Sequence, residues 1–288
     1  MRLADLEDRR PVGGGDICNA YRGRWQGRDV FAKTLRDAPP GFFTAEANGL
    51  RWLGEAGAPV PEVLAATDEL LVLEWVDSGR PTRAAATALG TALAAVHATP
   101  APAFGADWDG YVGSVPMDNT PRYSRPDEWP AFFAEQRLLP LVRLAADRGS
   151  LDDRGRQAVE TVCERLPVLA GPPEPPALIH GDLWSGNVIW CGGSAGSGTA
   201  GEIRLIDPAA HGGHRESDLA LLAMFGFPEL DAVLAAYQRQ YPLAVGWRER
   251  VGLHQLHPML LHAALFGGSY GARVSSLARD QLARLPAS

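Results

Sequence analysis

The sequence has few cysteines, no cluster of basic residues and no long apolar run, and each shortage excludes a class of protein. Its three cysteines, Cys18, Cys163 and Cys191, are too few and too scattered for a disulfide framework or a Cys-x-x-Cys metal site. The net charge is −7, and nucleic-acid binding needs clustered cations that neutralise phosphates. No stretch approaches the roughly 18 apolar residues of a membrane span. We therefore expect no nucleic-acid partner and no membrane partner.

The composition describes a folded protein that is rich in turns. Hydrophobic residues make up 46% of the 288 positions and charged residues 21%, which is typical of a globular chain. The 32 glycines and 23 prolines indicate many turns and loops. Charges occur throughout the first twenty residues, so the apolar core of a signal peptide is absent. We expect a cytoplasmic protein and a monomer.

The first 76 residues predict a small β-rich lobe with one helix. Apolar alternation at 18–24 and 29–34, joined by Trp25-Gln26-Gly27-Arg28, is typical of a β-hairpin. Helical spacing of apolar residues follows at 41–56, and two short apolar strands follow at 64–66 and 70–76.

The remainder of the chain predicts a larger, mainly helical lobe. Residues 77–81 resemble a linker or hinge, and residues 82–288 form the second lobe. Helical patterns occur at 82–98, 128–147, 152–169, 217–224, 229–241 and 247–262, and short apolar strands occur at 177–179, 188–190 and 203–206. The Gly/Ser-rich segment 192–201 predicts a flexible hairpin tip. The expected fold class is α+β, with two unequal lobes.

The densest group of polar residues in an apolar setting is the segment 177–190, with the sequence ALIHGDLWSGNVIW. Asp182 and Asn187 lie five residues apart, which is the spacing of a kinase catalytic loop. In such a loop the aspartate accepts the proton of the substrate hydroxyl and the asparagine binds magnesium. Asp207 ends the next apolar strand, where it offers the oxygen ligand that a hard cation prefers.

Each residue of this loop also has an ordinary structural interpretation. Aspartate, asparagine and glycine are common turn formers, so His180, Asp182 or Asn187 alone fits a simple turn equally well. The joint occurrence of His-Gly-Asp, Asn187 and the Ile206-Asp207 pair favours phosphoryl transfer instead.

Three features nearer the N-terminus are arranged as a kinase requires. Gly13, Gly14 and Gly15 precede the first hairpin strand, where bare backbone amides can approach phosphates, although a flexible turn explains them as well. Lys33 ends the second strand, like the kinase lysine that pairs with nucleotide phosphates. Glu46 follows on the predicted helix, in the position of the glutamate that orients this lysine.

With these motifs the chain resembles the fructosamine kinase (ketosamine 3-kinase) family, within the protein-kinase-like and aminoglycoside-phosphotransferase-like fold. The blocks that carry the resemblance span much of the chain: HGDLWSGN at 180–187, YVGSVP at 111–116, WPAFFAEQRLLP at 129–140 and GHRESDLA at 213–220.

The resemblance implies roles for individual residues and two ligands, ATP and Mg²⁺. It makes Asp182 the proton acceptor, with Asn187 and Asp207 as magnesium ligands. Lys33 and Glu46 order the phosphates of ATP. Adenine meets backbone groups of the interlobe hinge, which falls on Glu74, Trp75 and Val76.

The implied reaction is phosphorylation of the 3-hydroxyl of ketosamines, the sugar adducts of free or protein-bound amines, after which the unstable product sheds its sugar. This is a deglycation repair role. We expect Trp184 on the substrate side, with His214 and Glu216 as further candidates for substrate contacts. Trp108 and Tyr111 can add to an aromatic wall, whereas Trp129 fits the core better.

Two other functions remain compatible with the same motifs. A kinase of choline, aminoglycosides or sugars would keep every catalytic residue and differ in the acceptor pocket. The second is a non-catalytic nucleotide-binding module. The presence of every catalytic residue type at its expected position argues against it.

Other polar residues receive structural interpretations. We expect Asp218 to hydrogen-bond the catalytic-loop backbone and Cys18 to act as a small apolar filler rather than a redox switch. Histidines occur at 211, 214, 254, 257 and 262 without cysteine partners or a His-Glu-x-x-His pattern, which disfavours a structural zinc site.

Overall fold

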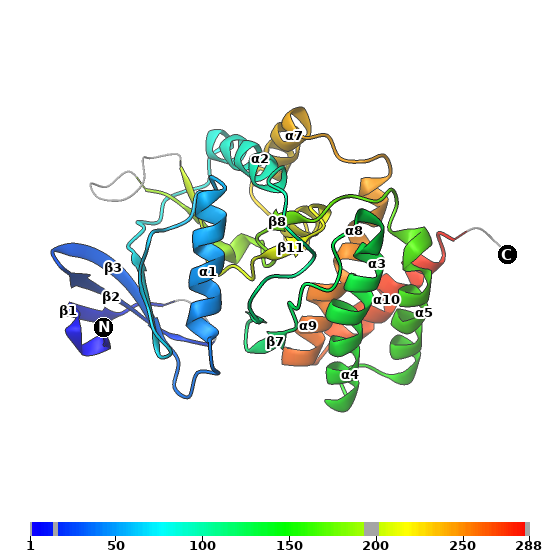
Figure 1. Ribbon diagram of the computed structural model, residues 1–288, viewed down its shortest axis with the longest axis horizontal. Coiled ribbons are helices and arrows are strands. Elements are labelled where there is room, and N and C mark those ends of the chain that lie inside the picture. Colours follow the sequence, from blue (N-terminus) through cyan, green and yellow to red (C-terminus); the bar gives the residue numbers. More distant parts are fainter. Residues whose placement is uncertain (1, 14–16, 193–201, 286–288) are drawn as a thin grey trace.

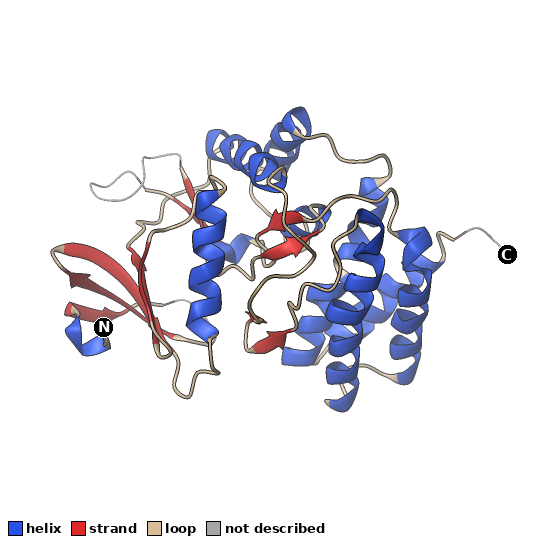
Figure 2. Cartoon of the chain, in the orientation of Figure 1, coloured by secondary structure: helices blue, strands red, loops and turns tan. Residues whose placement is uncertain are grey.

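A computed structural model describes residues 2–13, 17–192 and 202–285 of the chain (Figure 1). An antiparallel sheet with one helix forms the N-terminal part, and helices dominate the rest, as the colouring of Figure 2 shows. Helix α1 (Phe42–Glu55) stands between the sheet and the remaining helices. The predicted α+β class, with a small β-rich lobe and a larger helical lobe, is confirmed.

The large sheet contains five antiparallel strands in the order β1-β2-β3-β5-β4. Gln26 and Gly27 both have positive φ, which is the geometry of a type I′ turn, so β2 and β3 form the predicted hairpin. β1 has no apolar alternation because all five of its residues are exposed, and the sequence pattern did not indicate it. The strands are β1 (Glu7–Pro11), β2 (Asn19–Trp25), β3 (Arg28–Thr34), β4 (Val63–Ala66) and β5 (Leu70–Glu74).

The packing of α1 on the sheet positions one side of the site. Phe43 and Leu50, on one face of the helix, pack in a cluster with Leu71 and Leu73 of β5. Leu71 is the cross-strand partner of Lys33. The burial of this apolar face therefore holds α1 beside the end of β3.

The helical part contains two main apolar clusters. One lies between α2 and α7 and includes Leu89, Leu93 and Tyr237, and the other lies among α3, α4, α5, α9 and α10. The helices are α2 (Arg83–His97), α3 (Trp129–Phe132), α4 (Leu139–Asp147), α5 (Asp153–Leu169), α6 (Glu216–Leu222), α7 (Leu230–Gln240), α8 (Trp247–His254), α9 (Leu256–Phe266) and α10 (Tyr270–Leu282).

Two predicted helices are interrupted at prolines. The segment 128–147 contains a π-helical stretch, Phe133–Leu138, directly before α4, and Pro140 cannot donate to the carbonyl of Gln136. The segment 247–262 divides into α8 and α9, where Pro258 cannot donate to the carbonyl of His254. Helix α10 was not assigned from the sequence.

Short antiparallel pairs frame the centre of the helical part. β8 (Ala177–Ile179) pairs with β11 (His211–Gly213), and β9 (Val188–Trp190) pairs with β10 (Ile203–Leu205). A third pair joins β6 (Gly110–Val112) to β7 (Val115–Met117). Of the predicted flexible tip at 192–201, residues 193–201 lie outside the described residues. No helix among the described residues has the length and hydropathy needed to cross a bilayer.

Candidate active site

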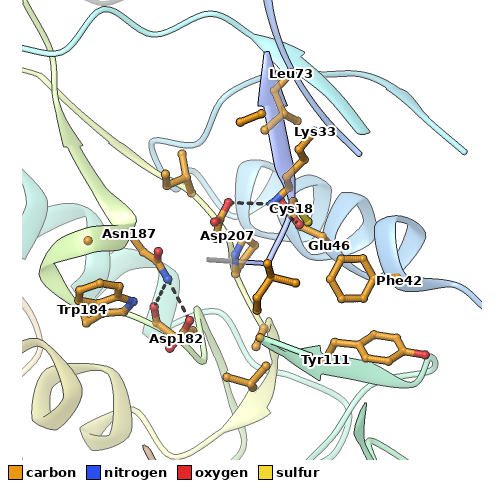
Figure 3. A pocket seen from close by; sticks show the side chains of 18 of the residues that line it. Cys18, Lys33, Phe42, Glu46, Leu73, Tyr111, Asp182, Trp184, Asn187 and Asp207 are labelled. Carbon is orange, nitrogen blue, oxygen red and sulfur yellow. Dashed lines mark hydrogen bonds and ion pairs between the residues drawn. The ribbon is translucent and has the colours of Figure 1, made fainter. Parts of the chain in front are cut away.

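A cavity of about 620 Å³ lies between the sheet and the helical part, and most of the predicted site residues line it (Figure 3). Gly14 and Gly15 lie outside the described residues. The predicted residues on the wall are Gly13, Lys33, Glu46, Glu74, Trp75, Val76, Asp182, Trp184, Asn187 and Asp207. The structure thus brings together groups that lie far apart in the sequence.

Lys33, Glu46 and Asp207 form an ion-paired group that we call the cavity cluster. Lys33 Nζ lies 2.6 Å from Glu46 Oε2 and 2.9 Å from Asp207 Oδ1. The side chains of Lys33 and Glu46 are 8% and 11% exposed, whereas Asp207 is 45% exposed. Burial disfavours the lysine charge, but the two carboxylates outweigh it and raise the pKa of Lys33. The lysine is therefore a fixed cation at the cavity wall.

The loop from His180 to Asn187 begins directly after β8. Gly181 has a φ of +82°, and a Cβ there would lie 2.2 Å from the carbonyl oxygen of Ala209, so only glycine fits. Asn187 Nδ2 donates to the backbone oxygen of Asp182 at 2.8 Å and to its carboxylate at 3.0 Å. This contact fixes the carboxylate on the cavity wall.

The environment of Asp182 suits a general base. Burial raises the pKa of Asp182 to about 7, and the neighbouring carboxylates of Asp207 and Asp218 add to this rise, while the hydrogen bond from Asn187 opposes it. A base is most effective when its pKa lies near the working pH. The carboxylate can therefore accept a hydroxyl proton close to neutrality.

A buried network supports the loop from behind. Asp218 accepts hydrogen bonds from the backbone amides of His180 at 2.7 Å and Gly181 at 2.9 Å, which confirms the role expected for it. Its carboxylate also lies 3.1 Å from His97 Nε2. His180 Nε2 lies 3.1 Å from the carbonyl oxygen of Ile206, so the loop and the strand end before Asp207 are held together.

Asn187 and Asp207 offer the ligands that Mg²⁺ prefers. The amide nitrogen of Asn187 is used on Asp182, and no described group donates to its Oδ1. Asp207 takes the left-handed conformation, with φ of +53°, and its carboxylate is half exposed to the cavity. Two hard oxygen donors on one wall fit a divalent cation that keeps several waters.

The hinge segment also lines the cavity. Trp75 N donates to the backbone oxygen of Asp29, and Glu74 N donates to that of Glu62. No described backbone carbonyl accepts from Val76 N. Of the three hinge amides, the one at Val76 is the donor available to a ligand.

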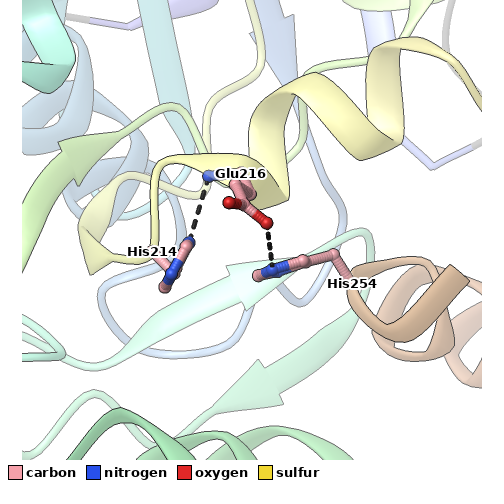
Figure 4. Close-up of side chains that lie close together, drawn as sticks. All are labelled: His214, Glu216 and His254. Atoms are coloured by element: carbon pink, nitrogen blue, oxygen red, sulfur yellow. Dashed lines mark hydrogen bonds and ion pairs between the residues drawn. The ribbon is translucent and has the colours of Figure 1, made fainter. Parts of the chain in front are cut away.

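The structure does not bring His214 and Glu216 to the cavity. They belong to a buried group that we call the closed cluster, with Arg250 and His254. Figure 4 shows His214, Glu216 and His254 of this group. Arg250 donates from Nε to Glu216 Oε2 at 2.9 Å and from Nη2 to Oε1 at 2.5 Å. The expectation that His214 and Glu216 contact the substrate finds no support in this placement.

The three potential metal ligands of the closed cluster, on His214, Glu216 and His254, have atoms within 4.8 Å of one another. Arg250 already occupies both oxygens of the carboxylate, and a guanidinium repels a second cation. Burial, followed by the nearby His254, holds the pKa of His214 well below its usual range, so that ring is neutral. The cluster joins α6 to α8.

Aromatic residues also line the cavity. Trp108, Tyr111 and Trp184 line it as expected, and Trp129 is buried in the core. Phe266 also lines the cavity, and Phe225 contacts Trp184 with ring centroids 6.1 Å apart. No sequence motif indicated these two phenylalanines, of which Phe225 follows α6 and Phe266 ends α9.

Comparison with solved structures defines the class of protein. An aminoglycoside phosphotransferase in complex with ADP and hygromycin B matches 99% of this chain, and this chain covers 97% of it, with a TM-score of 0.64 at 16% identity. This likeness concerns the fold alone. It places the chain in the protein-kinase-like fold of that structure.

The particular family follows from closer similarities. The family model for fructosamine kinase matches residues 2–284, so the chain belongs to that family. A putative fructosamine-3-kinase from Thermobifida fusca is 49% identical, with a TM-score of 0.89 over 96% of this chain and 94% of that one.

Named relatives agree with this assignment. A probable ketoamine kinase of Enterococcus faecium is 35% identical over 93% of this chain and 92% of the relative. The chloroplastic protein-ribulosamine 3-kinase of Arabidopsis thaliana is 30% identical over 96% and 83%.

Proposed function

We propose that the protein transfers the γ-phosphoryl group of ATP to the 3-hydroxyl of ketosamines, such as fructosamine and ribulosamine adducts of amines or protein lysines. The observation that carries this proposal is the placement of Asp182 and the Lys33–Glu46 pair on one cavity, in a member of the fructosamine kinase family. The phosphorylated product sheds its sugar, so the role is repair of glycated amines.

Each residue contributes through a defined atom. Asp182 accepts the proton of the attacking hydroxyl while Asn187 holds its carboxylate in place. Lys33 donates to phosphate oxygens, and Glu46 keeps the ammonium group directed at the cavity. Because the pKa of Asp182 is about 7, its carboxyl group can both hold and release a proton near neutral pH.

Asn187 and Asp207 would hold Mg²⁺, which neutralises charge on the phosphates when it is bound. Adenine would accept a hydrogen bond from the amide of Val76, beside Glu74 and Trp75. Gly13, on the cavity wall, would lie along the phosphates. The cytoplasmic location, the monomeric state and the lobe boundaries at residues 76 and 82 remain predictions.

The acceptor class is tested by supplying the purified protein with ATP and Mg²⁺ and measuring ADP release. The acceptors are a fructosamine, a ribulosamine, choline and an aminoglycoside, with the reaction lacking any acceptor as baseline. We expect release above baseline with the ketosamines alone. Faster turnover of choline or the aminoglycoside would support another small-molecule kinase, and baseline rates with every acceptor would support a nucleotide-binding module.

A further inference from the structure

A row of aromatic rings leads from the catalytic loop to the surface. The ring centroids of Trp184 and Phe225 are 6.1 Å apart, those of Phe225 and His262 are 5.1 Å apart, and those of His262 and Phe266 are 5.6 Å apart. Trp184, His262 and Phe266 line the cavity, and Phe266 is 59% exposed. The row starts two residues after Asp182. It can therefore contact a substrate along its length, from the hydroxyl that reacts to the part that lies in solvent.

His262 carries one acceptor within this row. Its Nδ1 lies 2.7 Å from the carbonyl oxygen of Pro258, which can only accept, so Nδ1 holds the proton. In the neutral ring Nε2 then has the lone pair, and no described group is bonded to it. The ring thus offers an acceptor to an N–H group of a ligand.

Most carboxylates on the cavity wall are paired with basic side chains of the protein. Among the described residues that line it, the acidic ones are Glu46, Glu74, Asp182 and Asp207. Glu46 and Asp207 pair with Lys33, and Glu74 lies at the hinge, 3.8 Å from Arg204. The aromatic row therefore suits an apolar chain with an amide or a single cation better than a ligand with many cationic groups.

We propose that Phe225, His262 and Phe266 form a subsite for the substituent on the ketosamine nitrogen. The alkyl chain packs on the two phenylalanines, and His262 Nε2 accepts a hydrogen bond from a backbone amide beyond that chain. This subsite rests on the proposed function, and it selects glycated lysine within a peptide over adducts of small amines.

Three fructose adducts separate the parts of the subsite: those of methylamine, of butylamine, and of the ε-amine of Nα-acetyl-lysine methylamide. The wild type should show KM values that fall in this order. Phe225→Ala with Phe266→Ala should raise KM about 10-fold for the two longer adducts, by loss of apolar contact, and less for the methylamine adduct. Val245→Ala, at a 96% exposed position outside the cavity, is the control.

His262→Leu should raise KM about 5-fold for the lysine adduct alone, since one neutral hydrogen bond is lost, and His262→Gln should restore part of it. Changes in kcat that are equal for all three adducts, or unchanged KM ratios, would overturn the subsite. If the wild type phosphorylates none of the adducts, the proposed function fails and the subsite falls with it.

A second inference comes from the lysine content of the chain. Lys33 is the only lysine among 288 residues, and every other basic side chain except histidine is arginine. Lys33 is buried and ion-paired with Glu46 and Asp207. Ketosamines form when an unprotonated amine adds to a sugar aldehyde, loses water and rearranges without any oxidant. Guanidinium groups stay protonated and do not supply such an amine.

We infer that this protein does not form ketosamines on its own side chains and so escapes the damage that it repairs. The protein is incubated with ribose and no ATP, and adducts are counted by mass spectrometry. We expect none on a side chain, so that any adduct lies on the terminal amine. Arg273→Lys places an amine at an exposed position on α10 and should gain one adduct.

An adduct on Lys33, or none on the Arg273→Lys protein under conditions that modify a lysine-rich control protein, would overturn this inference. Adding ATP and Mg²⁺ to the glycated Arg273→Lys protein then tests the proposed function separately. Loss of the adduct would support ketosamine phosphorylation, whereas its persistence would count against that function and leave the resistance to glycation standing.

Discussion

The cavity cluster and the closed cluster are built from the same kinds of side chain, yet they differ in access. Lys33 with Glu46 and Asp207 borders a cavity of about 620 Å³, and one of its carboxylates is half exposed. Arg250 with Glu216 satisfies its charges inside the protein, where both side chains are below 10% exposed. The cavity cluster, unlike the closed cluster, lies where a ligand can reach its charged groups.

The largest effect on activity is expected from a substitution in the cavity cluster. Lys33→Met removes the cation that we propose orders the phosphates, and we expect kcat/KM to fall about 100- to 1,000-fold, or about 2.7–4 kcal/mol. The protein should stay folded, because the buried Glu46 carboxyl can take up a proton. Steady-state kinetics with ATP and a ketosamine provide the measurement.

Arg51→Met, which removes an exposed cation from α1, is the matched control for Lys33→Met and should keep the wild-type rate. Equal activity in the Lys33→Met protein would show that the cavity cluster does not serve the reaction.

The opposite result is expected in the closed cluster. Glu216→Gln leaves Arg250 buried without a carboxylate and should lower the free energy of unfolding by about 3 kcal/mol. The kcat of the folded variant should stay within about twofold of the wild type, since no substrate contact is lost. Chemical denaturation and kinetics on the same preparation measure both.

Glu249→Gln is the control for Glu216→Gln, because Glu249 is an exposed carboxylate on α8 that pairs with Arg284. A Glu216→Gln protein with normal stability and a large loss of kcat would move Glu216 back into the site.

The pH dependence of stability sharpens the same point. Burial raises the pKa of Glu216, but the His254 ring, 3.4 Å from its carboxylate, and the hydrogen bonds from Arg250 outweigh burial and lower the pKa to about 2. Because the pKa is lower in the folded protein, the ionised Glu216 stabilises the fold at pH values above its unfolded-state pKa of about 4.3. This stabilisation is lost as the pH falls toward 2. The Tm difference between wild type and Glu216→Gln should therefore be constant above pH 5 and shrink below it. A difference that stays unchanged down to pH 3 would contradict this account.

The smallest effect is expected at Cys18, which lines the cavity beside the cavity cluster. Burial raises the pKa of the Cys18 thiol, so little thiolate forms near neutrality. Cys18→Ala should change kcat/KM less than about twofold. Peroxide treatment of the wild type should also change kcat/KM less than about twofold. Strong inactivation by peroxide that Cys18→Ala abolishes would establish a redox role.

Local motifs account for what the sequence could predict. The loop from His180 to Asn187 and the hairpin that carries Lys33 are set by residues close in the chain, so their geometry followed from spacing and turn chemistry. Asp218 was predicted as a support of the loop, and its hydrogen bonds to the backbone confirm that role.

Long-range packing accounts for what the sequence could not predict. His214 and Glu216 lie in the segment 213–220, whose sequence resembles the family, but only the position of Arg250 on α8 shows that they are closed off from the cavity. His262 and Phe266 lie on α9, whereas Phe225 follows α6, so their juxtaposition depends on how α9 packs against the end of α6. Side-chain access is a tertiary property that residue spacing does not encode.

The most direct test of the central claim is the NMR identification of the phosphorylated product of a fructosamine, made by wild type and by Asp182→Asn. We expect phosphate on the oxygen of carbon 3 with the wild type. We expect no detectable product with Asp182→Asn, although that variant still binds ATP. Phosphate on another oxygen, or equal product from Asp182→Asn, would contradict the proposed function.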